Sequence, residues 1–188
     1  MGRNLAALKA EWGGQARSAF QALAGLKPRA AGDSAPGSIV ELRKFEDSKG
    51  RPSVALAVRS DLDIDKQVTA AGATWLDRQA IAREPAGLGG GGFGADVSDA
   101  LERRAEHLIA KGLATRQGNR VIFARDLLNT LRKRELGAAR AKLTEEIGRP
   151  HTPSATGEYV SGTYQRRITL ASGRFAMIDD GLGFQLVP

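Results

Sequence analysis

The chain has 188 residues, of which 41% are hydrophobic and 26% are charged, and its formal net charge at pH 7 is +7. This composition is typical of a soluble globular protein with one domain or two small ones. The absence of cysteine excludes disulfides, thiolate zinc sites and a cysteine nucleophile.

Charge and hydropathy also narrow the partners and the compartment. The sequence pI of about 10.1 favours nucleic acid or an acidic membrane surface over acidic small molecules. No apolar run approaches the roughly 20 residues of a membrane span, and residues 1–25 hold no continuous apolar stretch. We therefore expect a cytoplasmic protein that has no membrane partner.

Residues 1–35 have the pattern of an amphipathic helix followed by a linker. Apolar residues recur at helical spacing from Asn4 to Ala24, although Gly13 and Gly14 weaken the middle of this segment. The stretch from Lys27 to Gly37 is rich in proline, glycine and polar residues, as linkers are. The apolar stripe consists of Leu5, Leu8, Trp12, Ala16, Ala19 and Leu23.

A second region, residues 36–148, is predicted to begin with a hairpin. Apolar residues in 39–45 and 54–58 flank a polar turn at 46–50, which indicates two strands with one apolar face.

Three helices are predicted after this hairpin. They cover 61–68, a segment opened by Thr74, and Asp96 to Lys111. Thr74 and Asp77 have the spacing of an N-cap pair, and the acidic start of the third helix suits the positive end of a helix dipole. A glycine-rich loop, 85–94, separates the second helix from the third.

The third helix is followed by a tight hairpin and a long basic helix. Segments 113–115 and 120–124 flank the turn residues 117–119. The long helix is predicted from Arg125 to Ile147, where Gly148 ends it.

The last region, residues 149–188, alternates between apolar and polar residues as strands do. Turn residues separate four segments, so we expect an antiparallel β-meander that forms an incomplete small barrel with one unpaired edge. The whole chain is thus predicted to be α+β. The four expected strands are Tyr159–Tyr164, Arg167–Ala171, Phe175–Asp179 and Gly183–Val187.

One stretch, from Arg116 to Lys142, carries a net charge of +6 because eight basic residues are opposed only by Asp126 and Glu135. Such a cluster repels itself, which favours a surface that binds an anion, and nucleic acid is the most abundant polyanion. A solvated helix face is the alternative. On a helical wheel, four of the eight lie within about 80 to 100° of one another. The predicted nucleic-acid-binding residues are Arg116, Arg120, Arg125, Arg132, Lys133, Arg134, Arg140 and Lys142, and the four sharing a face are Arg125, Arg132, Lys133 and Arg140.

Two motif-like segments do not carry the chemistry that they imitate. Gly89 to Gly94 has the spacing of a dinucleotide fingerprint, but the segment before it is helical in pattern where the fingerprint needs a strand. Asp61, Asp63 and Asp65 imitate the start of a calcium loop that lacks its glycine and its final glutamate, so they are predicted to mark the start of a helix.

No combination of residues predicts catalysis, a metal or a cofactor. His107 and His151 are far apart in the sequence and have no spacing that would share a metal. Tyr159 and Tyr164 have no neighbouring base or metal, so they are expected in the core or on a sheet face. Asp179 and Asp180 precede a glycine as turn residues do. Trp75 and Phe93 are expected to be buried, since they lie away from the basic cluster.

The order of three helices and a hairpin resembles a winged helix-turn-helix, with 117–120 as the tip of the wing. The third helix, however, begins with Asp96, Asp99 and Glu102, which would repel phosphates in the usual docking. We therefore expect the wing and the helix after it to contact the DNA backbone and to leave the bases unread.

Four segments resemble the C-terminal region of relaxases, the mobilisation nucleases of conjugative plasmids and integrative elements. In that family an N-terminal domain nicks one DNA strand with a tyrosine and a histidine-bound metal, and the region resembled here follows it. No residue of this chain matches that catalytic motif, so the resemblance implies a non-enzymatic part that lacks the nuclease domain. The segments are Gly72–Pro85, Gly92–Ala114, Arg120–Leu136 and Tyr164–Pro188.

The sequence therefore predicts a non-catalytic DNA-binding region that contacts phosphates during plasmid mobilisation. One alternative is a protein-interaction module, in which the β-meander and the stripe of Leu5, Leu8 and Trp12 recruit relaxosome or type IV secretion proteins. Under this alternative a change of Trp12 or Phe184 is expected to disrupt the partner contact. A truncated gene remnant is the other alternative.

Overall fold

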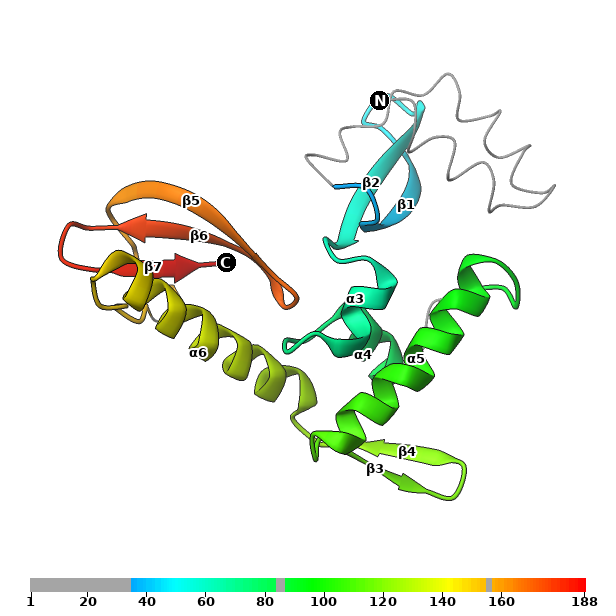
Figure 1. Ribbon diagram of the computed structural model, residues 1–188. Helices are drawn as coiled ribbons and strands as arrows, with labels where there is room; N and C mark the ends of the chain where they lie inside the picture. The colour runs from blue at the N-terminus through cyan, green and yellow to red at the C-terminus, as the bar shows by residue number, and fades with distance from the viewer. Residues whose placement is uncertain (1–34, 84–86, 155–156) are drawn as a thin grey trace.

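The computed structural model describes residues 35–83, 87–154 and 157–188. These residues form four helices and three small antiparallel sheets, so the predicted α+β class is confirmed (Figure 1). The predicted helix from Asn4 to Ala24 lies outside the described residues. None of the helices described is both long and apolar enough to span a bilayer.

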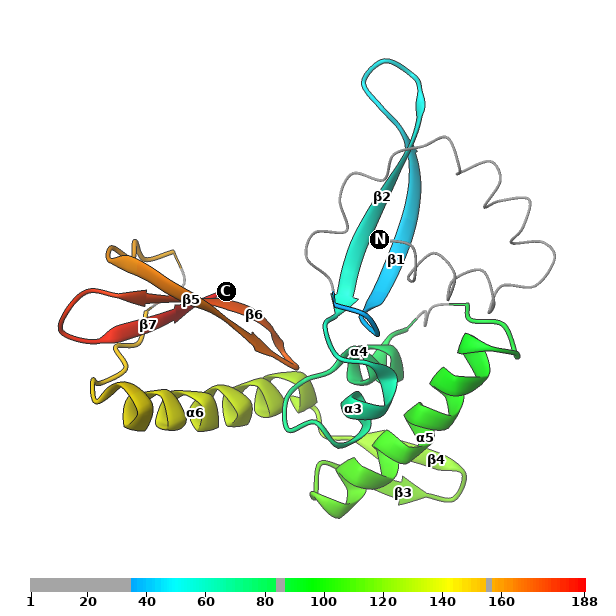
Figure 2. The same cartoon turned by 45° about the horizontal axis from the view of Figure 1, so that its top comes forward.

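The first sheet is the predicted hairpin, made of β1 (Ile39–Glu46) and β2 (Pro52–Ser60). Its turn is closed by Asp47, whose carboxylate accepts hydrogen bonds from the backbone N–H groups of Lys49 and Arg51 at 2.8 and 3.0 Å. Aspartate favours such a turn because its short side chain reaches the backbone a few residues on. The hairpin projects from the helices with this turn at its far end (Figure 2).

Three helices follow, α3 (Ile64–Thr69), α4 (Trp75–Ile81) and α5 (Phe93–Ala110), and α5 begins earlier than predicted. The predicted cap of α4 is confirmed. The Thr74 hydroxyl accepts from the Asp77 N–H at 3.2 Å, and the Asp77 carboxylate accepts from the Thr74 N–H at 2.7 Å. The apolar sides of the helices and of β1 meet in one cluster, formed by Ile39, Val68, Trp75, Leu76, Val97 and Ala100.

The turn between α3 and α4 is wrapped around Arg104, a residue of α5. Its guanidinium donates to the carbonyl oxygens of Val68, Ala70 and Gly72 at 3.1, 2.7 and 3.0 Å, and to both carboxylate oxygens of Asp77 at 2.8 Å. A buried charge is stable only when it is paired and hydrogen-bonded in this way. Arg104 therefore sets how α5 lies against the two short helices.

The next elements are the hairpin of β3 (Ala114–Gln117) and β4 (Arg120–Phe123), as predicted, and the long helix α6 (Leu127–Ile147). The helix begins two residues after the predicted start at Arg125 and ends, as predicted, at Gly148, whose φ of +70° suits glycine. A second cluster joins the α3–α4 turn, α5, the hairpin and the start of α6: Ala73, Leu108, Leu113, Ala114, Leu127 and Leu131.

The C-terminal sheet is a three-stranded meander in the order β5 (Thr163–Leu170), β6 (Gly173–Asp179) and β7 (Phe184–Val187). The predicted strand Tyr159–Tyr164 is wrong as a separate element, because only its last two residues are in a strand and they begin β5. Three strands are too few to curl round and meet, and none of the described sheets closes into a barrel.

The long helix α6 runs along one face of this sheet (Figures 1 and 2). Residues of α6 and of the sheet meet in a third cluster, formed by Leu143, Phe175, Met177, Phe184 and Leu186, with Leu136, Ile147, Ile168 and Leu170 packed around them.

A polar clamp holds the β5–β6 turn between α6 and the helices. The Glu135 carboxylate, on α6, accepts from the backbone N–H groups of Ala171 and Ser172 at 2.8 and 3.0 Å and from the Ser172 hydroxyl. That hydroxyl in turn accepts from the Ala73 N–H at 3.2 Å, and Arg78 donates to the Ser172 carbonyl at 3.3 Å. The sheet, α6 and the α3–α4 turn are thereby fixed to one another.

Candidate nucleic-acid interface

Two of the predicted cations stand on the β3–β4 hairpin, where Gly118, with φ of +58°, makes the tight turn. Arg116 forms an ion pair with Glu106 of α5, so its charge is partly neutralised. Arg120 is exposed and has no ion-pair partner among the described residues. The hairpin therefore offers one free guanidinium and one that is already held by a carboxylate.

The next cation, Arg125, stands between β4 and α6 and is exposed. The backbone around it is fixed, since the Ala124 N–H donates to the Leu113 carbonyl at 2.9 Å and the Leu127 N–H donates to the Ala124 carbonyl at 3.1 Å. An exposed side chain on a fixed backbone can meet an anion at little cost in backbone entropy.

Two cations of α6 lie on the side of the helix that packs on the C-terminal sheet. The Arg132 guanidinium lies 5.6 Å from the centre of the Phe175 ring, a cation–π contact. Arg140 is half-buried beside His151, and its Nε has no hydrogen-bond partner in the described structure. The helical wheel predicts that Arg132 and Arg140 share a face with Lys133. The sheet leaves Arg140 half-buried, while Arg132 stays exposed beside the Phe175 ring.

The opposite side of α6 faces solvent and carries Arg134, while Lys133 stands about 100° around the helix from both Arg132 and Arg134, at the edge of this side. Lys133 and Arg134 are exposed, and neither has an ion-pair partner among the residues described. Gly137, one turn further along, has open space where a Cβ would stand, so no side chain obstructs the surface beside these cations. Lys142 is exposed two turns further on, and about 80° around the helix from Arg134. Among the described residues, five of the eight predicted cations are exposed and contact neither a carboxylate nor an aromatic ring: Arg120, Arg125, Lys133, Arg134 and Lys142.

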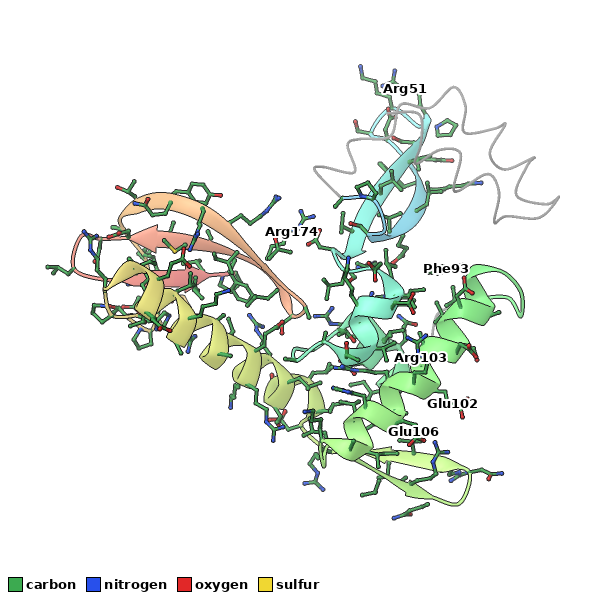
Figure 3. The ribbon with its side chains drawn as sticks, in the orientation of Figure 1. Arg51, Phe93, Glu102, Arg103, Glu106 and Arg174 are labelled. Carbon is green, nitrogen blue, oxygen red and sulfur yellow. The ribbon has the colours of Figure 1, made fainter. Side chains whose placement is uncertain are left out.

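Other arginines that the charge cluster does not include are held in ion pairs. Arg149 contacts Asp179 at 2.8 Å, and Arg166 contacts Glu146 at 2.8 Å. Arg174 donates from its Nε to Asp61 at 2.7 Å and ties β6 to the start of the helices; Figure 3 shows it at this side of the sheet. The sequence does not distinguish paired from free arginines, since each partner comes from a distant segment.

The exposed face of α5 is mostly acidic, as the sequence predicts. Glu102, Arg103 and Glu106 all lie along it (Figure 3). Arg103 is itself paired with Asp65 at 3.0 Å. This helix would therefore repel phosphates if it entered a DNA groove.

The motif-like segments have structural roles. The three aspartates after β2 point to three different partners: Asp63 accepts from the Lys66 N–H at 2.8 Å as the N-cap of α3, Asp61 binds Arg174 and Asp65 binds Arg103. Their predicted place at a helix start is confirmed. The element before the glycine loop is α4, also as predicted, and Gly92 is the N-cap of α5.

The two histidines lie apart, one on α5 and one beside the sheet. Burial, followed by the charges of Arg104 and Lys111, lowers the pKa of His107, and burial with the charge of Arg140 lowers the pKa of His151. In the part of the chain that the structure describes, no group of three or more His, Cys, Asp or Glu side chains could hold a metal ion.

The aromatic residues follow their predictions in part. Trp75 is buried and Phe93 is partly buried against the same cluster, with 6.3 Å between the ring centres. Tyr164 is on a sheet face and 60% exposed, whereas Tyr159 is 99% exposed, so its predicted burial or place on a sheet face is wrong. Phe184 is 1% exposed and belongs to the core. It is therefore not available for the partner contact considered in the sequence analysis.

Comparison with known proteins places the chain in a family without assigned activity. No curated protein and no solved structure matches it. The model of one family, described as "Protein of unknown function (DUF3363)", matches residues 39–188. This description does not mention relaxases. The chain therefore belongs to the DUF3363 family.

Proposed function

We propose that this protein is a non-catalytic DNA-binding region that holds the phosphate backbone during plasmid mobilisation. The observation that carries this proposal is the set of exposed cations that have no ion-pair partner among the described residues and that stand on the β3–β4 hairpin, the loop after it and α6: Arg120, Arg125, Lys133 and Arg134. Lys142 extends the set along the helix.

Unpaired surface cations are the groups that bind phosphates most readily, because no carboxylate has to be displaced first. Arg120 and Arg125 are arginines, whose planar guanidinium can donate two hydrogen bonds to one phosphate. The unobstructed surface at Gly137 leaves room for a phosphate backbone beside Lys133 and Arg134. Arg116 joins this set only when Glu106 releases it.

In this proposal α3, α4, α5 and the β3–β4 hairpin form a winged-helix-like unit with an altered docking mode. The hairpin acts as the wing and, with α6, meets the backbone, while the acidic α5 stays away from it. Contacts of this kind fix position and orientation and carry little sequence information. The resemblance of four segments to the C-terminal region of relaxases supports a place in DNA processing during conjugation.

The test is a titration of labelled duplexes of unrelated sequence at two salt concentrations. The proposal predicts similar affinities for the different sequences and a steep fall in affinity as salt is raised, since each phosphate contact releases counterions. Binding that does not respond to salt would refute it, and so would the absence of binding.

A further inference from the structure

The C-terminal sheet has a second face, which α6 does not cover. Residues that stand opposite each other in neighbouring strands share a face, so the register identifies it. Met177 and Phe175 face α6, and their strand partners Arg166 and Ile168 face it too. The remaining strand residues form the outer face: Tyr164, Arg167, Thr169, Arg174, Ala176, Ile178, Gln185 and Val187.

A β-bulge places Tyr164 on this outer face. The register of β5 and β6 shifts between Tyr164 and Arg166, so that Gln165 is the extra residue. Arg166 pairs with Met177 and reaches Glu146 of α6, while Tyr164 pairs with Ile178 on the other face. Bulges are a common way in which a strand re-aims a side chain.

We propose that this outer face binds single-stranded DNA, with one base stacked on Tyr164. Tyr164 is 60% exposed, which is high for a residue with a large aromatic side chain in a strand. Its neighbours on the face, Ala176 and Ile178, are partly buried and do not cover the Tyr164 side chain. Proteins that bind single strands combine an exposed aromatic ring of this kind with basic side chains.

The charges of the outer face fit a nucleic-acid strand. Its strand residues include two arginines, Arg167 and Arg174, and no carboxylate. Arg174 is held by Asp61 at one end of the face, which fixes its position. Arg167 is exposed near Tyr164, where a phosphate on either side of a stacked base would lie.

Gln185 also stands on this face, but its Oε1 is buried and lies out of reach of a base. Strands lie about 4.8 Å apart, so three strands offer a platform for two or three bases.

This inference rests on the proposed function for its choice of nucleic acid, but it concerns another surface and can fail alone. The test compares Tyr164→Ala, Tyr164→Phe and Tyr159→Ala in binding to a dT oligonucleotide and to a duplex of the same length. Tyr159 serves as the matched control because it is exposed and stands before β5, outside the outer face.

The expected result is a loss of roughly tenfold in dT affinity for Tyr164→Ala, with duplex affinity unchanged. Tyr164→Phe, which keeps the ring, and Tyr159→Ala should bind dT as the original chain does. Unchanged dT affinity in Tyr164→Ala would overturn the inference and, if salt-dependent duplex binding remains, would leave the proposed function intact. Failure of the original chain to bind either DNA would overturn both.

Discussion

Asp77 and Arg104 form an ion pair at 2.8 Å with side chains that are 0% and 1% exposed. The Asp77 carboxylate also caps α4 through Thr74, and the Arg104 guanidinium also binds the carbonyls of the α3–α4 turn. One pair therefore joins α4, α5 and the turn before α4. Loss of either partner leaves a buried charge alone.

We predict that Arg104→Met lowers the free energy of unfolding by about 3–5 kcal/mol, because it strands the Asp77 carboxylate and three carbonyl oxygens. Urea unfolding followed by circular dichroism measures this. The neighbouring Arg103→Met is the control, since its pair with Asp65 is exposed and is worth about 1 kcal/mol or less. Equal effects of the two variants would contradict the structural role given to Arg104.

The polar clamp gives a prediction about coupling between Glu135 and Gly72. A Cβ on Gly72 would lie 1.9 Å from Oε2 of Glu135, so Gly72→Ala should push the carboxylate out of the clamp. Glu135→Ala should cost about 1–3 kcal/mol, because the N–H groups of Ala171 and Ser172 lose their acceptor.

Once Glu135 is alanine, the obstacle is gone, and Gly72→Ala should be neutral or stabilise by up to about 1 kcal/mol. A double-mutant cycle measured by urea unfolding would show this coupling. Glu145→Ala, an exposed residue on the same helix, should change stability little. Additive costs of the Gly72 and Glu135 changes would show that the clamp is not formed as described.

The ion pair of Glu106 with Arg116 predicts a gain in DNA affinity when it is broken. Glu106→Gln removes one negative charge and frees Arg116 for a phosphate. Glu102→Gln removes the same charge from the same helix, one turn away, and no ion pair involves Glu102 in the described structure (Figure 3). Fluorescence titration with a duplex should therefore show a larger gain for Glu106→Gln. Equal gains would indicate a general charge effect alone.

The histidines predict a loss of stability on mild acidification. Burial lowers the pKa of His107 and of His151 below the ordinary 6.5, so the unfolded chain takes up protons first as pH falls. The contribution of the two neutral histidines to the free energy of unfolding is fully present above pH 6.5. It is lost as the pH falls from there toward their lower pKa values in the folded state.

Urea unfolding between pH 7.5 and pH 5 tests this loss, and the double change of His107 and His151 to glutamine should flatten the decline. The aspartates with a lowered pKa, Asp47, Asp63 and Asp180, act only below the ordinary value of 3.8 and do not interfere. An undiminished decline in the double variant would contradict this assignment.

Features that depend on neighbouring residues were predictable from the sequence. The Thr74 cap and the turn at Gly118 follow from local hydrogen bonding and backbone preference, and both are confirmed. The start of β5 was less predictable, since an alternating pattern before Thr163 predicts a strand whether or not a neighbour exists to pair with it.

Features that depend on distant segments could not be read in this way. In the sequence Arg104 is one more charged residue of a helix, and its burial is decided by carbonyls more than 30 residues away. Arg132 and Arg140 share a wheel face, but a wheel does not show that Phe175 and His151 lie against that face. The candidate interface was therefore predictable as a stretch of sequence, while its division into free and occupied cations was not.

The most direct test of phosphate binding is the slope of log affinity against log salt concentration for a variant in which Arg120, Arg125, Lys133 and Arg134 are glutamine. The matched control changes Lys44, Lys49, Arg83 and Lys111, which are exposed elsewhere, to glutamine and so removes the same charge. We predict that the steepness of this negative slope decreases by about 0.9 for each lost phosphate contact, or ~3.6 in all, and decreases far less in the control. An equal slope in both variants would contradict it.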